Sequence, residues 1–133
     1  MSGYRSRSAY KLIEIIKKFN LLNNKDHVLD LGSSPGGWSQ VLTEKLVNGK
    51  VISVDLKRMD KIKNNIFIQG DFTDSEFQKK ILSIFDGRIE GVFSDMAKNT
   101  TGNKNLDSFR TGSLCLESMR FAAKILNKKG YFV

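Results

Sequence analysis

Three aspartates, each inside or just after a short apolar run, are the side chains best placed to do chemistry. Asp30 lies within the first such run, Asp55 ends the second and Asp95 follows a later one. Runs of this kind are typical of buried parallel strands, whose carboxyl ends share one edge of a sheet and bind ligands there. An acid at the end of the second strand of a nucleotide-binding unit commonly accepts hydrogen bonds from ribose hydroxyls. We therefore expect a ligand site where the three carboxylates converge.

A glycine-rich turn follows the first apolar run. Residues 32–37 read Gly-Ser-Ser-Pro-Gly-Gly and lead into Trp38, from which apolar side chains recur at helical spacing. Glycine lets the backbone approach a ligand closely, and the N–H groups of a helix N-terminus hold polar groups. The turn lacks both the G-x-G-x-x-G of dinucleotide sites and the Gly-Lys-Ser/Thr of P-loops. A tight strand–helix turn without a ligand is the alternative that the turn alone leaves open.

The N-terminal segment is strongly basic. Arg5 and Arg7 lead into an amphipathic stretch, residues 4–22, in which Lys11 lies at the edge of the apolar stripe. The whole chain has 22 basic and 14 acidic side chains and a formal net charge of +8, which favours nucleic acid as a partner before an anionic membrane surface. Flexible arginines followed by a cationic helix suit RNA phosphates. A solvated basic face is the alternative reading of this segment.

The elements that must position these residues alternate between strand and helix. Apolar runs predict strands at residues 28–31, 51–55, 66–69, 89–93 and 131–133. Helical spacing predicts helices over 4–22, after Trp38, behind residue 73 and over about 106–129. The alternation predicts an α/β fold with a parallel sheet and right-handed crossovers, in one domain spanning residues 1–133. Within it, the basic arm and helix occupy 4–22 and the ligand-binding core 26–133.

The last predicted helix should pack one apolar face on the sheet. Its expected inner residues recur at helical spacing; they are Phe109, Leu116, Met119, Ala123 and Leu126.

Composition excludes several protein classes. A single cysteine excludes an internal disulfide and fits a reducing compartment. No apolar run approaches the roughly 20 residues of a membrane span, and no signal-peptide pattern opens the chain. No His or Cys cluster has metal-ligand spacing, so we expect no metal. These features predict a cytoplasmic protein that does not bind a membrane.

Four motifs, in order along the chain, resemble those of the FtsJ/RrmJ family. They are Arg-Ser-Arg-Ser-Ala-Tyr-Lys-Leu at 5–12, Asp-Leu-Gly-Ser-Ser-Pro-Gly-Gly-Trp-Ser-Gln at 30–40, Gly-Asp-Phe at 70–72 and Ser-Asp-Met-Ala at 94–97. The resemblance implies an S-adenosylmethionine-dependent methyltransferase acting on a ribose 2′-hydroxyl of RNA. It also implies a Rossmann-like methyltransferase fold, a mostly parallel sheet with helices on both faces. The nearest branch is the bacterial and organellar enzyme that modifies a uridine of large-subunit ribosomal RNA.

The same resemblance implies roles for individual residues. The turn would hold the methionine end of S-adenosylmethionine, Asp55 the ribose hydroxyls and Asp71 the adenine, with Asp95 beside the transferred methyl group. The implied cofactor-binding set is Asp30, Gly32, Ser33, Pro35, Gly36, Gly37, Trp38, Asp55, Asp71 and Asp95. For Asp71 alone, an acid that leads the helix behind Thr73 is the alternative.

Family members carry a Lys-Asp-Lys-Glu catalytic tetrad, which this chain matches in part. Lys11 matches the first lysine and Asp95 the aspartate. The second lysine and the glutamate are expected beyond Val133, so the sequence resembles a C-terminally truncated enzyme that lacks the last strands of the sheet. Lys98 stands where the family usually has proline. The implied RNA-binding residues are Arg5, Arg7, Lys11 and Lys98.

The sequence therefore predicts a monomeric methyltransferase whose partner is ribosomal RNA or the large ribosomal subunit, in the bacterial cytoplasm or an organelle. A non-catalytic RNA- or ribosome-binding module that keeps the fold is the alternative, since half of the tetrad is absent. A methyltransferase acting on protein or a small molecule is a third possibility that the basic arm disfavours.

Overall fold

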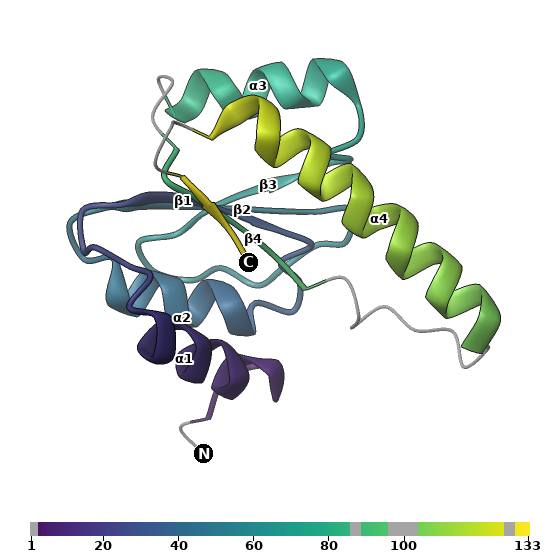
Figure 1. Cartoon of the computed structure of the whole chain (residues 1–133). Coiled ribbons are helices and arrows are strands. Elements are labelled where there is room, and N and C mark those ends of the chain that lie inside the picture. Colours follow the sequence, from purple (N-terminus) through teal and green to yellow (C-terminus); the bar gives the residue numbers. More distant parts are fainter. Residues whose placement is uncertain (1–2, 86–88, 96–103, 127–129) are drawn as a thin grey trace.

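The computed structural model describes residues 3–85, 89–95, 104–126 and 130–133. Helices and strands alternate along this part of the chain (Figure 1). In order, the elements are α1 (Ser8–Phe19), β1 (His27–Leu31), α2 (Gly37–Lys45), β2 (Lys50–Asp55), β3 (Ile66–Gln69), α3 (Ser75–Phe85), β4 (Gly91–Ser94), α4 (Lys104–Ile125) and β5 (Tyr131–Phe132). Each predicted strand is present, within two residues of its expected bounds.

The strands form one parallel sheet in the order β3-β2-β1-β4-β5. The chain moves outward from β1 through β2 to β3, then returns to the other side of β1 for β4 and β5. The order therefore reverses between β1 and β4, the point where open parallel sheets bind ligands beyond the carboxyl ends of their strands. The α/β prediction is confirmed.

Helices cover both faces of the sheet (Figure 1): α1 and α2 lie on one face, and α3 and α4 on the other. The pleat of β1 divides its side chains between two cores. Val28 packs with Leu12 and Leu42 on the α1/α2 face, whereas Leu29 and Leu31 join the core under α3 and α4. Asp30 follows the same alternation, so its side chain lies on the α1/α2 face beneath the glycine-rich turn.

Two predictions about helices are wrong. The first helix begins at Ser8 rather than residue 4, so residues 3–7 form a separate N-terminal arm, although Arg7 already has helical φ and ψ. The second concerns α4. Leu116 and Met119 are 47% and 52% exposed, and Ala123 is also exposed.

The buried face of α4 is a neighbouring stripe, made of Ser118, Phe121, Ala122 and Ile125. Its spacing is also helical, but it includes Ser118, whose hydroxyl lies 3.3 Å from that of Ser94 on β4. A hydroxyl that finds a partner in the sheet can be buried, which hydrophobicity alone does not reveal. Leu126 packs against this core as expected. The side chain of Phe109 lies outside the described residues.

No helix within the described residues is long and apolar enough to cross a membrane.

Candidate functional site

The glycine-rich turn is anchored to the end of β2. The N–H groups of Gly32 and Ser33 both donate to the carbonyl of Val54, at 2.8 and 3.0 Å. Gly32 and Gly36 have positive φ, 69° and 120°, which side chains with a Cβ rarely adopt. The chain thereby turns from β1 over the edge of the sheet and enters α2 at Gly37.

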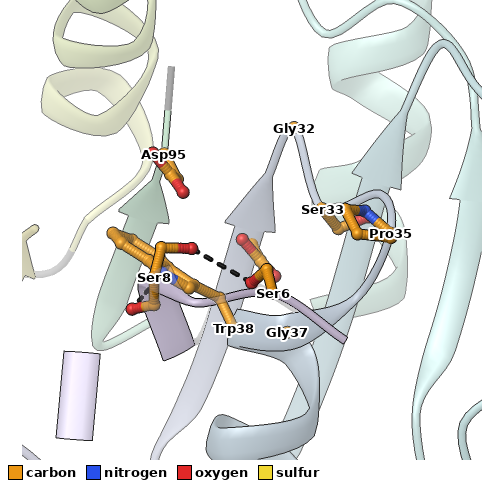
Figure 2. Close-up of a pocket in the computed structure, with 9 residues that line it drawn as sticks. Ser6, Ser8, Gly32, Ser33, Pro35, Gly37, Trp38 and Asp95 are labelled. Carbon is orange, nitrogen blue, oxygen red and sulfur yellow. Dashed lines mark hydrogen bonds between the residues drawn. The ribbon is translucent and has the colours of Figure 1, made fainter. Parts of the chain in front are cut away.

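A pocket opens at this turn, between the ends of β1 and β4 (Figure 2). The residues that line it come from the N-terminal arm, the start of α1, β1, the turn, the start of α2 and the position just after β4. They are Ser6, Ser8, Asp30, Gly32, Ser33, Pro35, Gly37, Trp38 and Asp95. The pocket therefore lies where the strand order reverses.

Seven of the predicted site residues meet in this pocket: Asp30, Gly32, Ser33, Pro35, Gly37, Trp38 and Asp95. Sequence reasoning missed Ser6 and Ser8 as lining residues. Their only sequence signal is their place in the basic motif at 5–12, whose charges favour RNA binding and do not indicate a role for its hydroxyls.

The turn glycines make room for the N-terminal arm. A Cβ on Gly36 would lie 2.9 Å from Arg5 Nη1 and 3.1 Å from Ile62 Cδ1, and one on Gly37 would collide with the Ser6 hydroxyl. Protein atoms of the arm therefore lie close to both glycines. Their roles in cofactor binding remain predictions.

The hydroxyl of Ser33 is a buried polar group of the pocket. Ser33 is 3% exposed, and its Oγ makes no hydrogen bond to any residue that the structure describes. Burying a hydroxyl without a hydrogen bond costs roughly 1–3 kcal/mol, so such groups are uncommon unless a ligand or water pairs with them. The pocket is therefore suited to a polar ligand.

Below the turn, a chain of buried hydrogen bonds ends on Asp30. Ser39 Oγ donates to Asp30 Oδ2 at 2.6 Å, and the Ser39 and Ser53 hydroxyls lie 2.5 Å apart. A hydroxyl has one hydrogen, so Ser53 must donate to Ser39, and Asn65 Nδ2 in turn donates to Ser53 Oγ at 2.8 Å. Asp30, Ser39 and Ser53 are each no more than 1% exposed. The sequence signal for these hydrogen bonds is Ser53, the one polar residue within the run 51–54 of β2.

Asp55 lies at the end of β2 but not on the pocket wall. Its Oδ2 accepts the N–H of Ser34 and its Oδ1 that of Lys57, both at 2.8 Å. Asp55 as a whole is 9% exposed. It thus connects the turn to the loop that follows β2, and contact with a ribose remains a prediction.

Asp71 has a local role in the structure. Its Oδ1 accepts both the N–H of Thr73, at 2.9 Å, and the Thr73 hydroxyl, at 2.6 Å, while the residue is exposed. This agrees with the alternative of an acid that leads α3, although α3 begins at Ser75 rather than directly behind Thr73. Its contact with adenine remains a prediction.

The N-terminal arm is packed onto the turn. Arg5 Nη1 donates to the carbonyls of Pro35 (3.1 Å) and Asp60 (2.7 Å), and Nη2 donates to that of Lys61 (3.2 Å). The backbone N–H of Arg5 donates to Gln40 Oε1 at 2.7 Å. The prediction that Arg5 belongs to a flexible arm is therefore wrong.

Two aromatic side chains add to the contact between the arm and α2. Tyr4 donates its hydroxyl to Glu44 Oε2 at 2.6 Å, and this hydrogen bond raises the pKa of Tyr4. Trp38 Nε1 donates to the Ser8 carbonyl at 3.2 Å, so the pocket wall itself is bonded to the start of α1.

The other predicted basic residues lie apart from the pocket wall. Arg7 and Lys11 are exposed, Arg7 just before α1 and Lys11 near the start of the helix. Asp95 lines the pocket, so the two matched members of the tetrad do not both lie on its wall. Lys98 lies outside the described residues. Among the residues that are described, no group of three or more His, Cys, Asp or Glu is placed to hold a metal ion.

The family described as FtsJ-like methyltransferase matches residues 4–133. The chain belongs to this family. It is also similar to "Ribosomal RNA large subunit methyltransferase E" of Pelagibacter ubique (strain HTCC1062), with 50% identity over 133 residues. The protein of the same name from Rickettsia akari (strain Hartford) is 42% identical over 139 residues. Both matches cover all of this chain, but only 66% and 61% of the relatives.

Solved structures agree with the FtsJ-like assignment. A Plasmodium falciparum protein named a ribosomal RNA methyltransferase superimposes with a TM-score of 0.84 at 37% identity, over 96% of this chain and 76% of that one. The MycE methyltransferase of the mycinamycin biosynthetic pathway superimposes with a TM-score of 0.59 over 96% of this chain and 34% of that one; at 19% identity this shows the fold alone. The predicted family and the Rossmann-like methyltransferase fold are confirmed. The chain spans about two thirds of the curated FtsJ-like relatives or slightly less.

Proposed function

We propose that this chain binds S-adenosylmethionine and forms the cofactor-binding part of an RNA ribose 2′-O-methyltransferase. The proposed substrate is a uridine of large-subunit ribosomal RNA, free or in the ribosomal subunit. One observation carries the proposal: in a member of a methyltransferase family, a pocket at the reversal of strand order is lined by Asp30, Asp95 and Ser33, whose buried hydroxyl has no partner among the described residues.

The residues of the pocket fit this cofactor chemically. S-adenosylmethionine carries positive charge on its sulfonium and ammonium groups, and a carboxylate attracts both. The buried hydroxyl of Ser33 can pair with a polar group of the methionine end. Trp38 supplies an aromatic face on the pocket wall, and such faces attract cations. The cofactor would supply an activated methyl group.

The protein's share of the reaction is to hold and orient the attacking hydroxyl. A ribose hydroxyl is a weak acid, so a positioned base or cation must assist its attack. In this proposal Lys11, exposed near the start of α1, orients the hydroxyl, and Asp95 holds a lysine beside the methyl group. The family's second lysine and its glutamate would follow Val133. Arg7 and the net charge of +8 would attract RNA phosphates.

Cofactor binding is the first test, and the chain offers its own probe. Trp38, the single tryptophan, lines the pocket, so its fluorescence should change as S-adenosylmethionine is added. Asp55→Ala should weaken that binding about tenfold, the loss expected for one hydrogen-bonded charged group. Asp60→Ala is the matched control, because it removes the same charge from an exposed side chain of the neighbouring loop. Unchanged affinity in Asp55→Ala would remove Asp55 from the site.

Methyl transfer is the second test. Labelled methyl from S-adenosylmethionine is offered with unmethylated large ribosomal subunits to this chain and, in parallel, to the complete Pelagibacter ubique relative. Label on a ribose 2′-oxygen of the RNA supports the proposal. If this chain binds cofactor and RNA, but neither this chain nor the complete relative transfers label to ribose, the non-catalytic RNA-binding module replaces the proposed enzyme. Binding of RNA that falls steeply with salt separates both from a methyltransferase of small molecules.

A further inference from the structure

We propose that Arg5 is a positioning residue for the cofactor, not an RNA contact: its guanidinium holds the glycine-rich turn and the loop after β2 in the arrangement that binds S-adenosylmethionine. This inference rests on the proposed function. Its basis is the set of hydrogen bonds that Arg5 makes across the two loops, together with the wall that the arm adds to the pocket.

The guanidinium joins two loops that are far apart in sequence. It donates to the carbonyl of Pro35 in the turn and to the carbonyls of Asp60 and Lys61 beyond β2. The planar fork of arginine has two terminal nitrogens that can reach separate acceptors at once, which a lysine ammonium matches poorly. The three carbonyls thereby have a shared donor at the outer side of the site.

Asp55 makes the complementary connection on the inner side. Its carboxylate accepts the N–H of Ser34 in the turn and that of Lys57 in the loop. One anion thus accepts one N–H from each loop, and one cation donates to carbonyls of both. Both connections must form for the loops to keep a fixed separation, and a pocket that is already arranged binds more tightly than one that binding must order.

The arm that carries Arg5 also forms part of the pocket wall. Ser6 and Ser8 line the pocket, and Figure 2 shows them beside Trp38 and below Asp95. The indole of Trp38 donates to the carbonyl of Ser8. Ser6 is packed so closely on Gly37 that a Cβ there would strike it. Releasing Arg5 would therefore loosen the wall as well as the two loops.

Arg7 is a matched comparison for Arg5. It carries the same charge two residues along and is exposed, just before α1. Arg5→Met and Arg7→Met remove equal charge, so a purely electrostatic contribution to RNA binding would fall by similar amounts in both. Only Arg5→Met removes hydrogen bonds to the pocket loops.

The experiment measures cofactor affinity, through Trp38 fluorescence and calorimetry, in the unaltered chain, Arg5→Met, Arg5→Lys and Arg7→Met. Circular dichroism confirms folding at the working temperature. We expect Arg5→Met to weaken S-adenosylmethionine binding about tenfold, Arg5→Lys to recover part of the loss and Arg7→Met to change it less than twofold. A merely structural role would lower the melting temperature of Arg5→Met without changing the cofactor dissociation constant.

The outcomes separate the two proposals. If the unaltered chain binds no S-adenosylmethionine, the proposed function fails, and the positioning role of Arg5 fails with it. If the unaltered chain binds but Arg5→Met binds equally well while losing RNA affinity as Arg7→Met does, only the positioning role is overturned. If Arg5→Met does not fold, Arg5→Lys decides: affinity equal to that of the unaltered chain overturns the positioning role.

Discussion

Replacing Ser39 by alanine should destabilise the chain far more than the loss of one oxygen atom suggests. The Ser39 hydroxyl donates to the carboxylate of Asp30 and accepts from Ser53, and neither serine is exposed. A hydrogen bond to a charged group contributes roughly 1.5–3 kcal/mol, and the Ser53 hydroxyl left without an acceptor adds a penalty of roughly 1–3 kcal/mol. Allowing for relaxation, Ser39→Ala should lower the free energy of unfolding by about 3 kcal/mol.

The donor and acceptor roles along the hydrogen bonds from Ser53 to Ser39 to Asp30 give a sharper test in the double variant. Ser53→Ala should cost about 1–2 kcal/mol, since it leaves Ser39 without a donor and Asn65 Nδ2 with only the Val51 carbonyl. In Ser39→Ala/Ser53→Ala no orphaned serine hydroxyl remains. The double variant should therefore lose about 1 kcal/mol less than the sum of the two single variants.

Urea unfolding, followed by circular dichroism, measures these free energies. Ser83→Ala is the control, because the Ser83 hydroxyl donates to the Lys80 carbonyl on the exposed side of α3, and its loss should stay within about 0.5 kcal/mol. If Ser39→Ala resembles this control, or if the two single losses simply add, the buried hydrogen-bond chain does not hold Asp30 as described.

Two further predictions concern catalysis and pH. Lys11→Ala, made in whichever length of the chain transfers methyl, should lower turnover about a hundredfold or more while the dissociation constant of S-adenosylmethionine stays nearly unchanged; unchanged turnover would remove Lys11 from the mechanism. Burial, with the Asp26 carboxylate that accepts the Tyr131 hydroxyl, raises the pKa of Tyr131. A raised folded pKa means that this stabilisation is complete below the unfolded pKa of about 10 and is lost as pH rises above it. Urea midpoints should thus fall more steeply above pH 10 in the unaltered chain than in Tyr131→Phe, and parallel falls would contradict the cause.

Local patterns were enough to predict the sheet and most of the pocket. The strand ending in Asp30 and the turn through Gly36 are each specified within a few residues, and β1 and β4 bring Asp30 and Asp95 to one pocket because parallel strands align their carboxyl ends. Asp30 and Asp95 meet because β1 and β4 are neighbours in the sheet. The resemblance to a known family then supplied the chemistry that spacing alone does not identify.

The predictions that were wrong concern contacts between residues distant in sequence or small differences between the faces of a helix. Nothing near Arg5 in the sequence indicates that its donors reach Pro35 and Asp60, because that contact exists only once the arm has folded over the turn. In α4, the stripe through Leu116 is more hydrophobic than the stripe through Ser118, yet Ser118 is buried because Ser94 pairs with it. A single hydrogen bond between β4 and α4 changes which face of α4 is buried. The spacing of apolar residues along α4 does not reveal such a bond.

The position of Arg5 also connects the two parts of the proposed reaction site, the cofactor pocket and Lys11. Arg5 places its donors on the pocket loops, whereas Arg7 remains exposed and α1 begins one residue later, at Ser8. Fixing the arm therefore fixes where α1 starts, and Lys11 lies within the first turn of that helix. In the proposed mechanism, the orientation of Lys11 toward a ribose hydroxyl thus depends on the same hydrogen bonds that hold the two loops. On that proposal, a misplaced arm would affect the cofactor and the substrate together, because the same few residues of the arm would position both.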